Sequence, residues 1–321
     1  MRSFAGALFL MLIFSIANAD SGHVEISDIA KLQILLDCAG FSPGEIDDYW
    51  GMNTQKALAV FQHTQGLPIS IEPNKETWQA LGASERSLLT VYTITAQDAK
   101  GPFIDIPSDY MEKAKLSALR YSTVREAIAE KFHIREQFLK ELNPDAQFVE
   151  GEQIIVPNVL DFRCFGTNNL LNKYFRKASS TQKPSATEVK LTVSAKGSDI
   201  MVWDKDKIIF YAPMTYGGER DPLPVGKRKV SGIIPNPHYS YNPSLFWDAA
   251  PHHKPAKLAP GPNNPVGLVW IAINQQHVGL HGTADPSSIG YVQSHGCIRL
   301  TNWDALRLAS LVRAGTEVTF E

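Results

Sequence analysis

Apolar residues recur at helical spacing in the first quarter of the chain, between residues 25 and 82. Ser27 can cap a first helix that stops at Gly40, Thr54 can cap a second, and a third short helix closes at Gly82. The apolar positions on these helices are Ile29, Leu32, Leu35, Leu36, Ala39, Ala57, Val60, Phe61, Trp78 and Leu81. The spacing therefore predicts a small three-helix domain over residues 25–82.

Residues 90–158 mix helical and extended patterns. Thr123 and Glu126 form a capping-box pattern that opens one helix, and a second helix stops at Asn143–Pro144. Residues 151–157 are typical of a strand, and residues 90–95 are a candidate for its partner strand. The order favours a small α+β segment, with a plain linker subdomain as the alternative.

The pattern changes again after a polar stretch, residues 176–187, which indicates a linker. Beyond it, short β-branched and aromatic runs alternate with Gly, Pro and Asn, and residues 213–265 suggest a long loop system. Asn302 can cap a single final helix that stops at Gly315. Residues 188–321 are therefore predicted to form a β-rich domain with one C-terminal helix.

The N-terminus has the pattern of a secretory signal peptide over residues 1–19. Arg2 precedes an apolar run, residues 4–16, and Ala17-Asn18-Ala19 is an A-x-A cleavage site. The run is short for a membrane-spanning helix, so an uncleaved anchor is the less favoured alternative. We expect an exported protein in the periplasm or associated with the cell wall, not a transmembrane protein after cleavage.

Length, net charge and cysteine count limit the possible domain number, partners and disulfides, but they do not identify a function. A length of 321 residues predicts two or three domains, and a net charge of -2 gives no electrostatic reason to expect nucleic acid as a partner. The three cysteines, Cys38, Cys164 and Cys297, leave at least one outside any internal disulfide. Cys38 lies on an apolar helix face, where core packing is favoured, and a Cys38–Cys164 disulfide is the alternative.

The candidate chemistry lies at Cys297 and His281. A cysteine attacks as its thiolate, which is scarce at neutral pH unless a neighbouring imidazole accepts the proton. His281 ends a predicted strand, and Cys297 lies on a Gly-bearing loop. Gly296 allows unusual backbone dihedrals there, which would direct backbone N–H groups at a developing oxyanion.

Two resemblances concern the N-terminal half. The spacing L-Q-x-L-L…G-F…D-D-x-W-G…F-Q…G-L-P over residues 32–68 resembles the helical peptidoglycan-binding domain. The family more often has a glycine where Asp48 stands, and an unrelated three-helix module is the alternative. The order helix, helix, Asn143-Pro144, then G-x-x-I-x-V-P is similar to the second half of a LysM glycan-binding module, although residues 96–122 are longer than the usual connection.

A third resemblance covers essentially the whole of residues 188–321. Ser294-His295-Gly296-Cys297 follows His281 at the gap found in cysteine L,D-transpeptidases of the YkuD/ErfK type, and Ile298-Arg299-Leu300 continues the match. Further matches lie at Tyr241-Asn242-Pro243, residues 261–267 and Trp270-Ile271. The resemblance implies a mixed-sheet sandwich, so the expected whole is multidomain.

The resemblance also implies a role for each matched residue. Cys297 would be the nucleophile and His281 the base and acid, oriented by the carbonyl group of Gly282. His295 would support the pair from outside it, with the Ser294 hydroxyl beside it. The backbone N–H groups of Gly296 and Cys297 would donate hydrogen bonds to the oxyanion. Arg299 would either hold the loop or meet a substrate carboxylate, and the sequence does not separate these roles.

The implied reaction is acyl transfer from a tetrapeptide stem, with release of D-Ala, to an amine acceptor. The product would be a 3→3 peptidoglycan cross-link or a link between peptidoglycan and a wall lipoprotein. The expected partners are therefore peptidoglycan stem peptides and glycan. A carboxypeptidase or endopeptidase that uses water, and a non-catalytic wall-binding protein, remain alternatives.

Other chemistries have weaker sequence support. His281, His295 and Cys297 could form a zinc site in principle, but no H-E-x-x-H or C-x-x-C accompanies them. His252-His253 lies in a Pro-rich loop, where we expect exposure to solvent. Because G-x-S-x-G, G-x-G-x-x-G and Walker patterns are also missing, we expect no metal and no cofactor.

Overall fold

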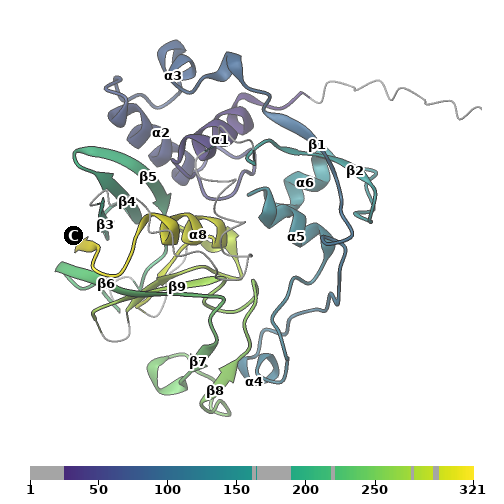
Figure 1. The fold of residues 1–321 in the computed structure, drawn as a ribbon, viewed down its shortest axis with the longest axis vertical. Coiled ribbons are helices and arrows are strands. Elements are labelled where there is room, and N and C mark those ends of the chain that lie inside the picture. Colours follow the sequence, from purple (N-terminus) through teal and green to yellow (C-terminus); the bar gives the residue numbers. More distant parts are fainter. Residues whose placement is uncertain (1–24, 161–163, 165–188, 218–220, 276–277, 292–295) are drawn as a thin grey trace, which may run out of the picture.

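The computed structural model describes residues 25–160, 164, 189–217, 221–275, 278–291 and 296–321 (Figure 1). The predicted signal peptide at 1–19 and the predicted linker at 176–187 lie outside these residues. Among the described residues, no helix has the length and apolar character needed to cross a bilayer.

The N-terminal unit consists of α1 (Asp28–Ala39), α2 (Met52–Thr64) and α3 (Lys75–Ala80). The side chain of Ser27 accepts hydrogen bonds from Ile29 and Ala30, and Gly40 ends α1 with a φ of 88°. The expected cap at Thr54 is wrong, because α2 begins earlier, after Gly51. Thr54 is instead buried and accepts a hydrogen bond from the Gln33 amide, which stabilises the packing of α2 on α1.

The middle unit has the expected strand–helix–helix–strand order. A short 3-10 turn, η1 (Ala83–Glu85), precedes β1 (Leu89–Thr93), which pairs antiparallel with β2 (Gln153–Pro157). Between these strands lie α5 (Val124–Lys131) and α6 (Glu136–Leu142), whose apolar faces share one core with the strands. The long connection before α5 contains α4 (Tyr110–Lys113), which lies far from β1 in the fold (Figure 1). The likeness to LysM stays a prediction.

The C-terminal domain contains one curled sheet with the strand order β11-β10-β9-β6-β12-β3-β4-β5 among the described residues. Its strands are β3 (Val189–Ser194), β4 (Asp199–Asp204), β5 (Lys207–Pro213), β6 (Gly226–Pro235), β9 (Val269–Ile273), β10 (Gly279–His281), β11 (Ile298–Arg299) and β12 (Glu317–Phe320). The first half of β6 pairs with β12 and the second half with β9, with a register shift between Val230 and Gly232. The predicted sandwich is therefore a single sheet that bends at β6.

One helix, α8 (Asn302–Leu311), packs into this domain, as the sequence predicts. Its cap is Thr301 rather than Asn302, because the Thr301 hydroxyl accepts the hydrogen bond from the Asp304 amide. A separate pair of strands, β7 (Tyr239–Tyr241) and β8 (Ala256–Leu258), projects from the sheet beside α4 (Figure 1). Short 3-10 turns, η2 (Pro243–Leu245) and η3 (Pro286–Ser288), lie in the neighbouring loops.

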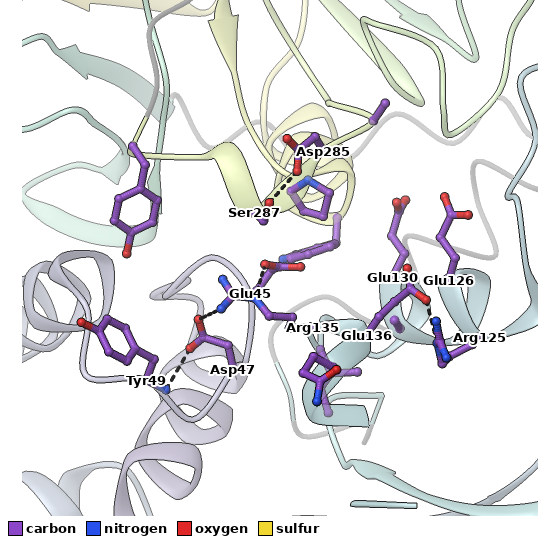
Figure 2. A pocket seen from close by; sticks show the side chains of 17 residues that line it. Glu45, Asp47, Tyr49, Arg125, Glu126, Glu130, Arg135, Glu136, Asp285 and Ser287 are labelled. Atoms are coloured by element: carbon purple, nitrogen blue, oxygen red, sulfur yellow. Dashed lines mark hydrogen bonds and ion pairs between the residues drawn. The ribbon is translucent and has the colours of Figure 1, made fainter. Parts of the chain in front are cut away.

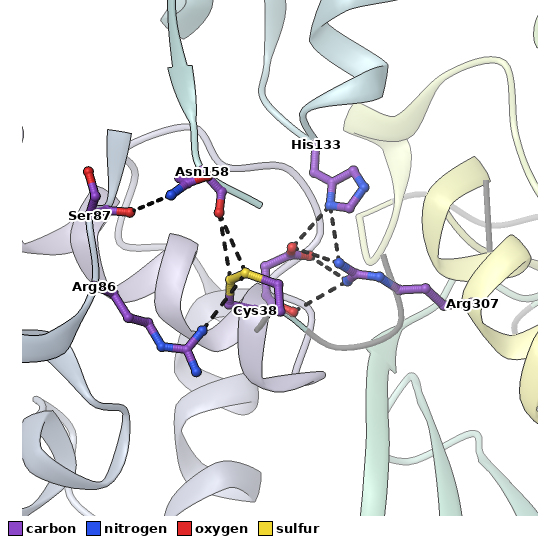
Figure 3. Close-up of a disulfide and its surroundings, with 8 residues drawn as sticks. Cys38, Arg86, Ser87, His133, Asn158 and Arg307 are labelled. Carbon is purple, nitrogen blue, oxygen red and sulfur yellow. Dashed lines mark hydrogen bonds and ion pairs between the residues drawn. A yellow bond between two sulfur atoms is a disulfide. The ribbon is translucent and has the colours of Figure 1, made fainter. Parts of the chain in front are cut away.

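A buried ionic network joins the three units. Arg307 of α8 makes two hydrogen bonds to the Asp37 carboxylate of α1, at 2.7 and 2.9 Å, and the His133 Nδ1 lies 3.0 Å from the same carboxylate (Figure 3). The neighbouring Arg307 and His133 hold the pKa of Asp37 below its usual range, although burial opposes this shift. The His133 ring also stacks on Trp303, so aromatic packing covers one side of the ionic network.

A disulfide joins Cys38 of α1 to Cys164 (Figure 3). Cys38 is buried on the apolar face of α1, as the sequence predicts. It is also bonded to Cys164, the less favoured alternative, which the sequence spacing did not support. The bond closes a loop over a sequence separation of 126 residues. Because stable disulfides form in oxidising compartments, this bond agrees with the expected export.

Breaking the buried ion pair should destabilise the whole protein. We expect Asp37→Asn to lower the free energy of unfolding by about 3–5 kcal/mol, because Arg307 then stays buried without its charge partner. The change is measured by urea or thermal denaturation. The control is Lys31→Ala, which breaks the exposed Lys31–Asp28 pair and should cost less than about 1 kcal/mol. Equal effects from the two variants would contradict this account.

Removing the disulfide should also lower stability. We expect the double variant Cys38→Ala/Cys164→Ala to lose about 2–5 kcal/mol, because the unfolded chain regains the freedom of a long open loop. A thermal melt of the oxidised protein with and without reductant gives an independent measurement. A melt that reductant leaves unchanged, in a sample whose thiols are shown to be reduced, would refute this expectation.

Candidate active site

His281 and Cys297 come from adjacent parallel strands. His281 ends β10, and Cys297 directly precedes β11, with Leu280 opposite Ile298 and His281 opposite Arg299. Continuing this register by one residue places Cys297 beside Gly279. Alternate residues of a strand share one face, so Cys297, Arg299 and His281 all lie on the same face of the sheet. The topology therefore brings the sequence-predicted pair together.

The His281 ring is buried and held in one orientation. Its Nδ1 lies 2.6 Å from the carbonyl oxygen of Gly282, which accepts a hydrogen bond from Nδ1–H and leaves the lone pair on Nε2. Trp270, the residue opposite on β9, stacks on the imidazole at a centroid distance of 5.3 Å. Burial lowers the pKa of His281 to about 3, and Arg299 also lowers it, so the imidazole is neutral near pH 7.

The Cys297 residue is half-buried, so it is less enclosed than His281. Burial raises the pKa of Cys297, while the backbone N–H of Gly279 and the charge of Arg299 lower it. The net shift is upward, so the resting pair is a neutral thiol and a neutral imidazole. Cys297 is the cysteine left outside the Cys38–Cys164 disulfide. A proton must therefore move from sulfur to nitrogen as the sulfur attacks.

The carbonyl group of Gly282 is positioned by the first residue of α8. A Cβ at Gly282 or at Gly267 would overlap the Asn302 side chain, so both glycines allow this amide to approach closely. The Asn302 Oδ1 accepts a hydrogen bond from the Leu268 amide at 3.0 Å, and its Nδ2 donates to the carbonyl of Pro262. The asparagine expected to cap the helix therefore supports the loop behind His281.

Gly296 has a φ of 95°, in the region that favours glycine, as the sequence predicts. Gly217 lies against it, because a Cβ at Gly217 would overlap the Gly296 nitrogen and Asp221. The close packing fixes the backbone directly before Cys297. Ser294 and His295 lie outside the described residues, so their roles stay predictions.

Arg299 makes its loop-holding contacts through the backbone. Its N–H donates to the Thr215 carbonyl at 2.8 Å, and its carbonyl accepts from the Thr215 N–H at 3.0 Å. The guanidinium lies close enough to Cys297 and His281 to influence the pKa of each. Arg299 therefore presents a positive charge beside the candidate nucleophile.

Three further residues of the site were not assigned roles from the sequence. Trp270 covers His281, and Gly279 leaves room for the Trp270 ring, which a Cβ at that position would overlap. Tyr239 of β7 lies near both Cys297 and Arg299, and burial is the largest cause that raises the pKa of its hydroxyl. Trp270 and Gly279 meet through the pairing of β9 with β10, whereas Tyr239 comes from the separate β7–β8 pair.

A cleft of about 810 Å³ lies where the three units meet, and neither Cys297 nor His281 lines it (Figure 2). Its charged side chains are largely paired. Arg135 lies 3.0 Å from Glu45 and from Asp47, and Arg125 lies 2.8 Å from Glu136. We interpret the cleft as part of the junction between units.

The comparisons with known proteins agree with two of the sequence resemblances. Residues 188–319 match the family described as L,D-transpeptidase catalytic domain, YkuD. Residues 26–81 match the family described as "Putative peptidoglycan binding domain".

Relatives with similar sequences carry matching names. The chain is 27% identical over 197 residues to a protein named "Putative L,D-transpeptidase YkuD" of Bacillus licheniformis, covering 60% of this chain and 91% of that protein. It is 42% identical over 74 residues to a protein named "Probable L,D-transpeptidase YbiS" of Escherichia coli K12, covering 23% of this chain and 24% of that protein.

Among solved structures, L,D-transpeptidase 3 of Mycobacterium tuberculosis is 18% identical, with a TM-score of 0.35, over 42% of this chain and 61% of that chain. The chain thus spans less than two thirds of this structural neighbour. Taken with the strand order and the register of β10 and β11, the family matches have a plain consequence: residues 188–319 are an L,D-transpeptidase catalytic domain of the YkuD family, and residues 26–81 are a peptidoglycan-binding domain.

Proposed function

We propose that this chain transfers an acyl group from a peptidoglycan stem peptide to an amine, with Cys297 as nucleophile and His281 as base and acid. The observation that carries the proposal is the parallel register of β10 and β11, which sets both residues on one face of the sheet. The enzyme class follows from the family match, whereas the residue roles, the donor and the acceptor are our proposals.

The first half-reaction forms a thioester. The Cys297 sulfur attacks the carbonyl carbon of the third stem residue, and its proton passes to Nε2 of His281. The oxyanion that forms would accept hydrogen bonds from the backbone N–H groups of Gly296 and Cys297. The C–N bond then breaks, His281 returns the proton to the departing amine, and D-Ala leaves.

The second half-reaction reverses these proton movements. The acceptor amine attacks the thioester carbonyl, His281 takes a proton from the amine nitrogen, and the C–S bond breaks as the sulfur regains a proton. The product is a 3→3 cross-link when the acceptor is another stem, or a protein–peptidoglycan link when it is a lysine of a wall lipoprotein. The Gly282 carbonyl keeps the imidazole in the tautomer that both steps need.

Two features support recognition of the substrate. Arg299 supplies a positive charge beside Cys297, so we assign it to binding a stem-peptide carboxylate. The peptidoglycan-binding domain would hold the enzyme on wall polymer and raise the local concentration of stems, which also favours the periplasm or the cell wall as the location. Export is supported by the Cys38–Cys164 disulfide, with the predicted signal peptide lying outside the described residues.

Removing either partner of the pair should abolish transfer. We expect Cys297→Ala to form no thioester with a carbapenem and no product, and His281→Ala to lower the rate about a hundred- to ten-thousand-fold. Intact-mass spectrometry and muropeptide analysis of digested sacculi measure both effects. His63→Ala, on the exposed side of α2, is the matched control and should behave as the parent.

The same assay separates the alternatives. Product that forms only with an added amine indicates transfer, whereas trimmed stems that form equally without it would indicate a hydrolase. Sedimentation with sacculi without any covalent product would indicate a wall-binding protein. Turnover by Cys297→Ala would refute the assigned nucleophile.

The acylation rate should be insensitive to mild acid. Because the pKa of His281 is lowered to about 3, its neutral base form persists as the pH falls through 6.5, the ordinary pKa of histidine. We therefore expect the second-order rate of carbapenem acylation to stay nearly flat from pH 8 to about 5. Trp270→Leu should admit water to the imidazole, raise its pKa toward the ordinary value, and make the rate fall at a higher pH. A parent profile that already falls near pH 6.5 would contradict this mechanism.

A further inference from the structure

A group of metal-ligating side chains lies outside the candidate active site. Asp109, His252 and His253 each offer one ligand atom, and these atoms all lie within 4.8 Å of one another. The Asp109 Oδ2 is 3.0 Å from the Nε2 of both histidines. Asp109 is separated from the two adjacent histidines by 143 and 144 positions in the sequence, so only the fold brings it to them.

The cluster connects two segments that lie outside the sheet. Asp109 caps α4, and the two histidines lie between β7 and β8, in a projecting arm that we define as residues 237–262. Tyr110 stacks on Tyr241 of the arm at a centroid distance of 4.3 Å. The Leu119 N–H also donates to the Pro260 carbonyl. The connection before α5 therefore docks against the arm, and the cluster lies at that contact.

Two residues of the cluster, His253 and Asp109, have supporting hydrogen bonds of the kind that orient metal ligands. The His253 Nδ1 lies 2.7 Å from the Tyr241 hydroxyl, which fixes the ring and leaves Nε2 directed at Asp109. The Asp109 Oδ1 accepts hydrogen bonds from the Met111 and Glu112 amides, so the carboxylate is held while Oδ2 points at the histidines.

Exposure of the histidines differs from the sequence expectation. The His252 side chain is 66% exposed, as expected in a Pro-rich loop, but the His253 side chain is only 9% exposed. The cluster is therefore enclosed by protein at His253 and open to solvent at His252. The open side leaves room for a water molecule as a further ligand.

We propose that Asp109, His252 and His253 bind one Zn²⁺ ion, with water in the fourth position. Two imidazole nitrogens and one carboxylate oxygen suit zinc, whereas calcium and magnesium prefer all-oxygen sites. Tetrahedral bonds of about 2.0–2.1 Å separate ligand atoms by about 3.3 Å, close to the 3.0 Å that the structure gives between Asp109 and each histidine.

The ion would fasten α4 to the arm above the catalytic face. The arm carries Tyr239, which lies near Cys297, and Tyr110 lies near enough to Arg299 for its charge to influence the tyrosine. Metal binding would therefore fix the two segments that border the approach to the thiol. Zinc binding by these three residues does not require the proposed reaction, so the two proposals can be tested separately.

The test is zinc binding by the full chain in a Cys297→Ala background, which removes the competing thiol. After treatment with a chelator and dialysis, calorimetric titration with Zn²⁺ and elemental analysis should give one ion per chain. His252→Ala, His253→Ala and Asp109→Asn should each weaken binding at least tenfold. Asparagine is a good helix cap, so the last variant retains α4 while removing the charge.

The matched control is His63→Ala, an exposed histidine on α2, which should leave affinity and stoichiometry unchanged. His252 is exposed, so its variant should melt like the parent without metal, and a loss of binding there cannot be attributed to misfolding. A stoichiometry near zero in the Cys297→Ala background would overturn the proposal. Affinity that survives all three ligand variants would overturn it as well, because the ion would then bind elsewhere.

Discussion

The structure depends on one buried ion pair. Arg307 and Asp37 are almost fully buried, and such charges must stay paired because separating them leaves each in a medium that solvates it poorly. Arg307 belongs to the catalytic domain and Asp37 to the peptidoglycan-binding domain, with His133 of the middle unit on the same carboxylate. The pair therefore specifies a single arrangement of all three units, which the Ser42–Asp304 hydrogen bond reinforces.

The helix that carries Arg307 also packs beside the proposed catalytic base, His281. Arg307 lies in the middle of α8, and Asn302 at its start fills the space beside Gly282 and Gly267. The Gly282 carbonyl in turn accepts the hydrogen bond from His281. A shift of α8 along its axis would thus disturb both the domain junction and the orientation of the imidazole. Helix α8 therefore connects the peptidoglycan-binding domain to the loop that orients His281. This connection is a physical reason for the domains to pack against one another instead of being joined only by flexible linkers.

Local sequence patterns predict the helices and strands, whereas the caps and the contacts around the site depend on residues far apart in the sequence. The apolar spacing of α1 and the capping box before α5 depend on residues close in sequence, so both helices could be predicted. Thr54 does not cap α2 because it lies inside the helix, where its hydroxyl accepts a hydrogen bond from Gln33 of α1. The motif allows His281 and Cys297 to be proposed as a pair, whereas Trp270 and Gly279 contact each other across paired strands. Tyr239 comes near the site from the separate β7–β8 pair, a contact that no local pattern specifies.

The protonation state of the resting pair fits an oxidising environment. A thiolate is the form of cysteine that oxidants and disulfides attack, so a permanently ionised Cys297 would be exposed to loss in the compartment that forms Cys38–Cys164. Burial instead raises the pKa of Cys297 and lowers that of His281 to about 3, which keeps both neutral until a carbonyl carbon is presented. Under the proposed mechanism, bond formation to that carbon drives the proton to Nε2. In that mechanism the Trp270 ring, which stacks on His281, would keep water away from the base. The separated charges would then form only when hydrogen-bond donors are in place to stabilise the substrate's oxyanion.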